Sequence, residues 1–255
     1  MSSEIIVLCI AAFAAGFIDA VVGGGGLVQT PAILVALPQY PVATLLGTAK
    51  IPSFCGTSIA CFQYAKRVQL QWKLLLAMCC IALLAAMAGS YTVAIVSNSF
   101  MKPFIFFILI LVALYTWMKK DFGNTVSKNL QPSRELLYAV LFAILIGFYD
   151  GFIGPGAGSF LVLFFISVLG FDFLKASAHA KFVNLATNTG SIIYFGASGN
   201  ILFQFAIPMA AFNIAGSFLG SRLAIIRGNK FIRLFFLLVI SATLVRFGYD
   251  IFFKK

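Results

Sequence analysis

Long apolar segments alternate with short polar connections along almost the whole chain. Eight segments are long enough to cross a bilayer as helices, because a crossing needs about 17 to 25 mostly apolar residues. They lie near residues 5–22, 43–64, 74–96, 101–118, 136–153, 174–196, 201–223 and 231–253. Two shorter apolar stretches each follow a glycine cluster, at 26–37 and 157–170. The pattern predicts an all-α polytopic membrane protein.

Composition indicates the same class. Of 255 residues, 62% are hydrophobic and 10% are charged, which leaves too few polar groups to cover a water-soluble domain of this size. The net charge of +11 comes from Lys and Arg residues clustered between apolar segments, as is typical of membrane-flanking positions. We therefore expect lipid around the chain and no nucleic-acid partner.

Polar linker 119–135 divides the chain into an N-terminal transmembrane repeat, 1–118, and a C-terminal transmembrane repeat, 136–255. The halves match without a gap when the second is shifted back by 131 residues. The matched positions are mostly glycine and polar: Gly16-Phe17-x-Asp19 with Gly147-Phe148-x-Asp150, Ala49-Lys50 with Ala180-Lys181, Gly89-Ser90 with Gly220-Ser221, and Asn98 with Asn229. We infer a duplicated unit of about five helical segments, four long and one short.

Basic residues in equivalent connections have opposite bias. The connection near residue 70 is basic and its counterpart at 197–204 is uncharged, whereas in the next connection Lys102 stands against four basic residues of the second half. The two basic sets are Lys66, Arg67 and Lys73, and Arg222, Arg227, Lys230 and Arg233. The positive-inside rule then predicts inverted repeats, with both termini outside and the linker in the cytoplasm. If the short stretches do not cross, the alternative is a parallel arrangement of four crossings per half.

Glycine-rich runs at 23–26 and 154–158 precede the two short stretches. Glycine and proline disfavour a continuous helix, so each run predicts a break and a new helix beginning near residue 26 or 157. A helix N-terminus inside the membrane presents free N–H groups and a positive dipole end, which suit an anion. Close helix packing is the simpler alternative. Recurrence in both halves favours a substrate site that includes Gly24, Gly25, Gly26, Gly156, Ala157 and Gly158.

Lys50 and Lys181 each lie about seven residues into an apolar segment. A lysine at that depth is costly unless it faces protein, water or a counter-charge, although its long side chain can also reach for the interface. We select both as cationic groups of the substrate site. Hydrogen-bonding side chains near them complete the candidate set: Ser53, Thr57, Asn184 and Asn188, with Asn213 and Ser217 as weaker candidates for the cavity lining.

Asp19 and Asp150 each precede a glycine run by four residues. An intramembrane carboxylate can bind a proton or neutralise a lysine, and both uses stay open. The single histidine, His179, is a candidate proton acceptor, although a lone histidine is more often only hydrogen-bonded. We assign these three residues to ion coupling.

Catalytic, metal and cofactor chemistry has little support. The five cysteines lie within apolar segments at spacings that suit neither disulfides nor a metal cage. One histidine cannot supply several acid–base partners, and no nucleophile elbow is present. We expect no enzyme, no metal and no cofactor.

The chain opens with Gly-Phe-x-Asp-x-x-x-Gly-Gly-Gly-Gly from Gly16, continues with Gly47-Thr48-Ala49-Lys50 and a basic loop ending at Trp72, and repeats this order. It resembles the sulfite exporter TauE/SafE family, also called the toluenesulfonate uptake permease family. The resemblance implies an inner-membrane carrier of bacteria or archaea for sulfite or organosulfonates, coupled to an ion gradient. The second copy departs from the pattern at Pro155, Ala157 and His179.

We therefore expect a secondary transporter that moves a small sulfur-containing anion by alternating access around a midplane site. A passive anion channel or uniporter is the main alternative, and a membrane-embedded scaffold is disfavoured by the short connections. The expected partners are the anion, membrane lipid and a coupling proton or cation. The sequence leaves the oligomeric state open, a homo-oligomer included.

Overall fold

The computed structural model describes residues 3–101, 103–105, 107–108 and 131–253. Within these ranges every regular element is a helix, which confirms the predicted all-α class. Four helical spans are long and apolar enough to cross a bilayer: Glu4–Val22, Trp72–Ile95, Ser133–Phe152 and Phe203–Asn229. The chain is therefore a polytopic membrane protein.

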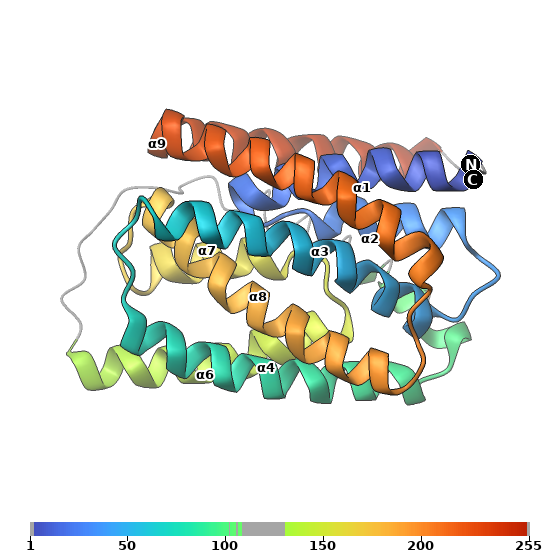
Figure 1. Cartoon of the computed structure of the whole chain (residues 1–255), viewed down its shortest axis with the longest axis horizontal. Helices are drawn as coiled ribbons and strands as arrows, with labels where there is room; N and C mark the ends of the chain where they lie inside the picture. Colours follow the sequence, from blue (N-terminus) through green and yellow to red (C-terminus); the bar gives the residue numbers. More distant parts are fainter. Residues whose placement is uncertain (1–2, 102, 106, 109–130, 254–255) are drawn as a thin grey trace.

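Each half contributes the same series of helices to this architecture (Figure 1). The first half contains α1 (Ser3–Val22), α2 (Gly26–Ala36), α3 (Val42–Ala65) and α4 (Trp72–Ile95). The second half contains α6 (Pro132–Phe152), α7 (Ala157–Ser167), α8 (Phe173–Ala197) and α9 (Phe203–Phe253). Gly228 has non-helical angles, φ 66° and ψ −159°, so α9 consists of two helical parts separated by a kink.

The helix positions agree with the apolar segments, with two qualifications. Part of segment 101–118, and residues 119–130 of linker 119–135, lie outside the described residues. Helix α6 begins at Pro132, inside the stretch predicted as linker, because proline suits the first turn of a helix and Glu135 complements its positive end.

The halves pack around each other with pseudo-twofold symmetry. Helix α1 lies along α9 and α6 lies along α4, while α3 contacts α9 and α8 contacts α4. Each of these pairs becomes the other when the halves are exchanged. Figure 1 shows α1 and α6 running in opposite directions, as α3 and α8 also do. This is the arrangement expected of inverted repeats.

A pair of asparagines repeats the symmetry at the level of single hydrogen bonds. Oδ1 of Asn98 accepts from the backbone N–H of Val42 at 2.8 Å, at the start of α3. Oδ1 of Asn229 accepts from the N–H of Leu174, also at 2.8 Å, at the start of α8. Equivalent asparagines therefore cap equivalent helices, which explains their agreement in the sequence.

Helices α3 and α8 contact each other at the centre and carry most of the buried polar side chains. They are long enough to cross a bilayer, at the predicted segments 43–64 and 174–196, although they are not among the four most apolar spans. Their buried polar residues include Thr48, Lys50 and Thr57 on α3, and His179, Lys181, Asn184, Thr187 and Asn188 on α8. Because polar groups are costly in lipid, these helices belong in the interior.

Candidate transport site between the two helix breaks

The two glycine runs meet in the middle of the molecule. Gly23 has a positive φ of 80°, and a Cβ on it would lie only 2.3 Å from the carbonyl carbon of Gly158. A Cβ on Gly158 would in turn lie 2.4 Å from the carbonyl oxygen of Gly23. These positions therefore require glycine for backbone contact between the repeats, as the close-packing interpretation predicted. The same contact brings the two breaks to one place.

Both breaks also present unpaired backbone donors. Helix α2 begins at Gly26 after the N-cap Gly25, and α7 begins at Ala157 after the N-cap Gly156. Within the described part of the chain, the amides of Gly25, Gly26, Gly156 and Gly158 donate to no acceptor. Two helix N-termini with free N–H groups thus converge, which produces a local positive potential.

Two ion pairs connect the repeats across this region. Nζ of Lys181 lies 2.8 Å from Oδ2 of Asp19, and Nζ of Lys50 lies 3.1 Å from Oδ2 of Asp150. Lys50 also donates to the backbone oxygen of Asp150 at 2.8 Å. The lysine side chains are 9% and 0% exposed for Lys50 and Lys181, so neither extends to the membrane interface. The pairing that the sequence left as an alternative is present.

The two ion pairs differ in their surroundings. Asp19 accepts from Lys181 and, at 3.4 Å, from the hydroxyl of Thr57. Oδ2 of Asp150 is buried and, although close to Lys50, accepts no well-directed hydrogen bond from the described residues. Asp150 therefore keeps a buried acceptor position that is incompletely satisfied.

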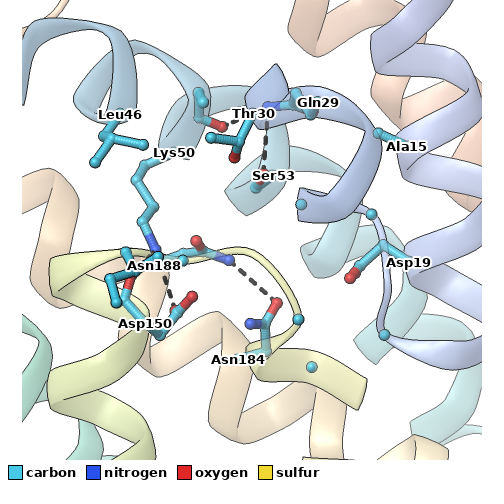
Figure 2. A pocket seen from close by; sticks show the side chains of 18 of the residues that line it. Ala15, Asp19, Gln29, Thr30, Leu46, Lys50, Ser53, Asp150, Asn184 and Asn188 are labelled. Carbon is cyan, nitrogen blue, oxygen red and sulfur yellow. Dashed lines mark hydrogen bonds and ion pairs between the residues drawn. The ribbon is translucent and has the colours of Figure 1, made fainter. Parts of the chain in front are cut away.

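A cavity of about 50 Å³ lies between the breaks and receives side chains from both repeats (Figure 2). Its volume suits a few waters or one small anion. Figure 2 shows Lys50 pointing to Asp150 on one side of the cavity and Asp19 on the other. Ten residues selected from the sequence line it: Asp19, Gly25, Gly26, Lys50, Ser53, Asp150, Gly156, Gly158, Asn184 and Asn188.

Five selected residues do not line the cavity: Gly24, Thr57, Ala157, Lys181 and His179. Thr57 and Lys181 lie behind the cavity wall, where both donate hydrogen bonds to the cavity residue Asp19.

The assignment of His179 to coupling stays a prediction, but both of its ring nitrogens already have hydrogen-bond partners. Nδ1 lies 2.7 Å from the carbonyl oxygen of Lys175, and Nε2 accepts the N–H of Gln71 at 3.0 Å. The bond with Gln71 joins α8 to the start of α4, and the bond with Lys175 lies within α8.

Sequence reasoning missed Gln29 and Thr30, which line the cavity from α2. Nε2 of Gln29 donates to the carbonyl oxygen of Ala49 at 2.7 Å, and Oε1 accepts from Nδ2 of Asn213 at 3.0 Å. Asn213, a weaker candidate, also lines the cavity. Ser217, the other weaker candidate, instead donates to the carbonyl oxygen of Gly16. The sequence does contain a signal for them, because Gln29 and Thr30 are the only polar side chains of α2, a short apolar helix that directly follows a glycine run.

Inverted repeats, two intramembrane helix breaks and a polar cavity between them define a class of protein, the membrane transporters built from inverted repeats. The sequence profile of the family described as Sulfite exporter TauE/SafE matches residues 8–247. The chain belongs to this family.

Curated relatives agree in length and in the class of protein. The "Probable membrane transporter protein ORF9" of a Sinorhizobium species is 36% identical over 241 residues, covering 94% of this chain and 90% of the relative. The "Probable membrane transporter protein YfcA" of Escherichia coli K12 is 32% identical over 252 residues, covering 96% and 89%. A "Probable membrane transporter protein" of Haemophilus influenzae is 32% identical over 228 residues, covering 89% and 88%. No solved structure matches the chain.

Proposed function

We propose that this protein is a secondary transporter that carries a small sulfur-containing anion, sulfite or an organosulfonate, across the inner membrane by ion-coupled alternating access. The observation that supports this most directly is the pair of reciprocal Lys–Asp contacts beside one cavity at two helix breaks. Family membership supports the class of substrate. As a transporter, the protein performs no covalent chemistry on the anion.

Anion binding would use groups of two kinds. Lys50 supplies a positive charge at the cavity wall, and the free amides of Gly25, Gly26, Gly156 and Gly158 supply N–H donors at two helix N-termini. The amides carry no counter-charge, so they favour an anion even while both lysines are paired. Thr30, Asn184 and Asn188 add side-chain hydrogen-bonding groups around the same space.

Coupling would arise because the anion and a carboxylate compete for one lysine. With Asp150 ionised, Lys50 is neutralised and an entering anion meets a nearby negative charge. A proton on Asp150 removes that charge and leaves Lys50 free to face the anion. The buried, incompletely bonded Oδ2 of Asp150 is a suitable position for this proton. Proton and anion would therefore bind together and move in the same direction.

Alternating access would use the symmetry of the repeats. In this conformation the Lys181–Asp19 pair is the more tightly bonded of the two, with Lys181 fully buried. If the two repeats exchanged conformations, the Lys50–Asp150 pair would take the buried, tightly bonded arrangement that the Lys181–Asp19 pair has here. The same exchange would open the cavity to the opposite side of the membrane. We place both termini outside, on the periplasmic side, and the linker in the cytoplasm, with a homo-oligomer compatible with this arrangement.

Counterflow in proteoliposomes tests this proposal against the passive channel or uniporter. Vesicles preloaded with unlabelled sulfite and diluted into labelled sulfite should accumulate the label transiently, and an inward proton gradient should accelerate uptake. Lys50→Gln should abolish both effects, whereas Lys73→Gln, which removes an exposed lysine outside the cavity, should preserve them. Uptake without counterflow and without response to the gradient would instead support the channel. Equal transport by Lys50→Gln and the control would reject the site.

A further inference from the structure

A second groove lies apart from the transport cavity, between the end of α3 and the middle of α9. Its volume is about 720 Å³, and none of its lining residues lines the central cavity. Its walls are mainly apolar: Ile59, Phe62, Phe218, Ile225 and Ile226. Gln63 connects the two helices across it, because Nε2 donates to the carbonyl oxygen of Phe218 at 3.2 Å.

Three cationic side chains gather at this groove. Lys66 and Arg67 follow the last residues of α3, and Arg222 comes from α9. All three are exposed, and none forms an ion pair with a described residue. Nζ of Lys66 lies 3.9 Å from the centre of the Phe62 ring, so the charge is held over the apolar wall. The groove thus combines an apolar surface with unneutralised positive charge.

The inverted repeat provides an internal comparison for this feature. At the 131-residue offset, Lys66 and Arg67 correspond to Ala197 and Ser198, and Arg222 corresponds to Tyr91. At the equivalent place, Tyr91 packs edge-on against Tyr194, with ring centroids 5.9 Å apart. The contact between α3 and α9 is therefore cationic, whereas the equivalent contact between α8 and α4 is aromatic. Packing of the shared fold does not require the three cations.

We propose that this groove binds one anionic phospholipid, with its phosphate among Lys66, Arg67 and Arg222 and an acyl chain along the apolar wall. A guanidinium group binds phosphate through paired hydrogen bonds, and basic pockets between transmembrane helices on the cytoplasmic side suit anionic headgroups. The positive-inside rule assigns this basic end to the cytoplasmic leaflet. A free phosphate ion would leave the apolar wall unused, so the combination of surfaces favours a lipid.

Lipid titration of the purified full-length protein tests the proposal. Native mass spectrometry in detergent would compare dioleoyl phosphatidylglycerol with dioleoyl phosphatidylcholine, which has the same chains without net charge. We expect tighter binding of phosphatidylglycerol by the wild type. In Lys66→Gln/Arg222→Gln its affinity should fall roughly 25-fold, because each charge near a headgroup contributes about a fivefold factor. The matched control Lys73→Gln/Arg134→Gln removes two exposed charges outside the groove and should bind like the wild type.

Three outcomes would overturn the proposal. The first is equal affinity for the two lipids, which would indicate an unselective annular lipid only. The second is equal loss of phosphatidylglycerol binding in the groove variant and the control, which would indicate an effect of net charge. The third is displacement of the lipid by millimolar inorganic phosphate, which would indicate a free anion site. Circular dichroism and gel filtration of each variant distinguish loss of the site from loss of the fold.

Discussion

Nζ of Lys181 donates a 2.8 Å hydrogen bond to Oδ2 of Asp19, a residue 162 positions earlier in the other repeat. Lys50 contacts Asp150 in the reciprocal way. The lysine of each repeat is therefore neutralised by the carboxylate of the other repeat, so both ion pairs depend on contact between the two halves. Because an uncompensated charge is costly in the membrane interior, these contacts favour association of the two halves.

Replacement of Lys181 by Met should destabilise the protein strongly, because it leaves the Asp19 carboxylate without its cation. Removal of one partner of a buried ion pair typically costs about 3–5 kcal/mol. The double variant Lys181→Met/Asp19→Asn should regain much of this loss, since no buried charge remains unpaired. Thermal unfolding in a fixed detergent measures the effect, with the exposed Lys73→Met as control. Additive losses in the double variant would show that the two residues act independently.

Much of this site follows from local rules that operate on the sequence. Apolar length predicts the crossings, glycine runs predict the breaks, and the cost of burying a charge marks Lys50 and Lys181. The partners of those lysines depend on packing between distant segments. The sequence therefore left two roles open for Asp19 and Asp150, neutralisation of a lysine and coupling to a proton. It could not show that each aspartate pairs with the lysine of the other repeat.

Gln29 and Thr30 show a different limit of sequence reasoning. The 131-residue offset directs attention to residues that both halves share, whereas Gln29 and Thr30 correspond to Phe160 and Leu161. The polar lining of the cavity is thus partly asymmetric, and comparison of the repeats conceals that part. Substrate recognition can differ between the halves even where the fold repeats.

Gly158→Ala should disrupt contact between the two breaks. Gly158 is helical without a positive φ, so the substitution adds only a methyl group, 2.4 Å from the carbonyl oxygen of Gly23 and 2.8 Å from its Cα. Both contacts are with backbone, which cannot rotate away, so we expect a loss of about 1–3 kcal/mol, as in overpacked cores. The melting temperature of the purified variant measures this loss.

Gly196→Ala is the matched control for the preceding substitution. Gly196 also lies in a helix, α8, but a Cβ there would meet only Cδ1 of Ile201, at 3.9 Å. Because alanine is the better helix former, this variant should be unchanged or more stable by up to about 1 kcal/mol. If both variants melt at the same temperature, close contact between the glycine runs does not limit stability.

Thr30→Val tests whether the asymmetric lining contributes to anion recognition. The Thr30 hydroxyl lines the cavity and forms no hydrogen bond with the described residues, so it is available to a bound anion. Valine has nearly the same shape, and we expect kcat/KM to fall about fivefold, the value of one hydrogen bond of about 1 kcal/mol. Thr92→Val, at a partly exposed position of α4 outside the cavity, should leave transport unchanged. Equal kinetics of the two variants would remove Thr30 from the recognition site.

Equivalent positions of the two repeats should lie on opposite sides of the membrane. Lys73, at the start of α4, and Gln204, at the start of α9, correspond under the 131-residue offset, and both are exposed. In a background without the five native cysteines, Lys73→Cys should react with an impermeant maleimide only from the cytoplasmic side, and Gln204→Cys only from the opposite side. Intact cells and inside-out vesicles provide the two accessible faces. Labelling of both cysteines from one side would instead support parallel repeats, and the proposed exchange of conformations between halves would lose its structural basis.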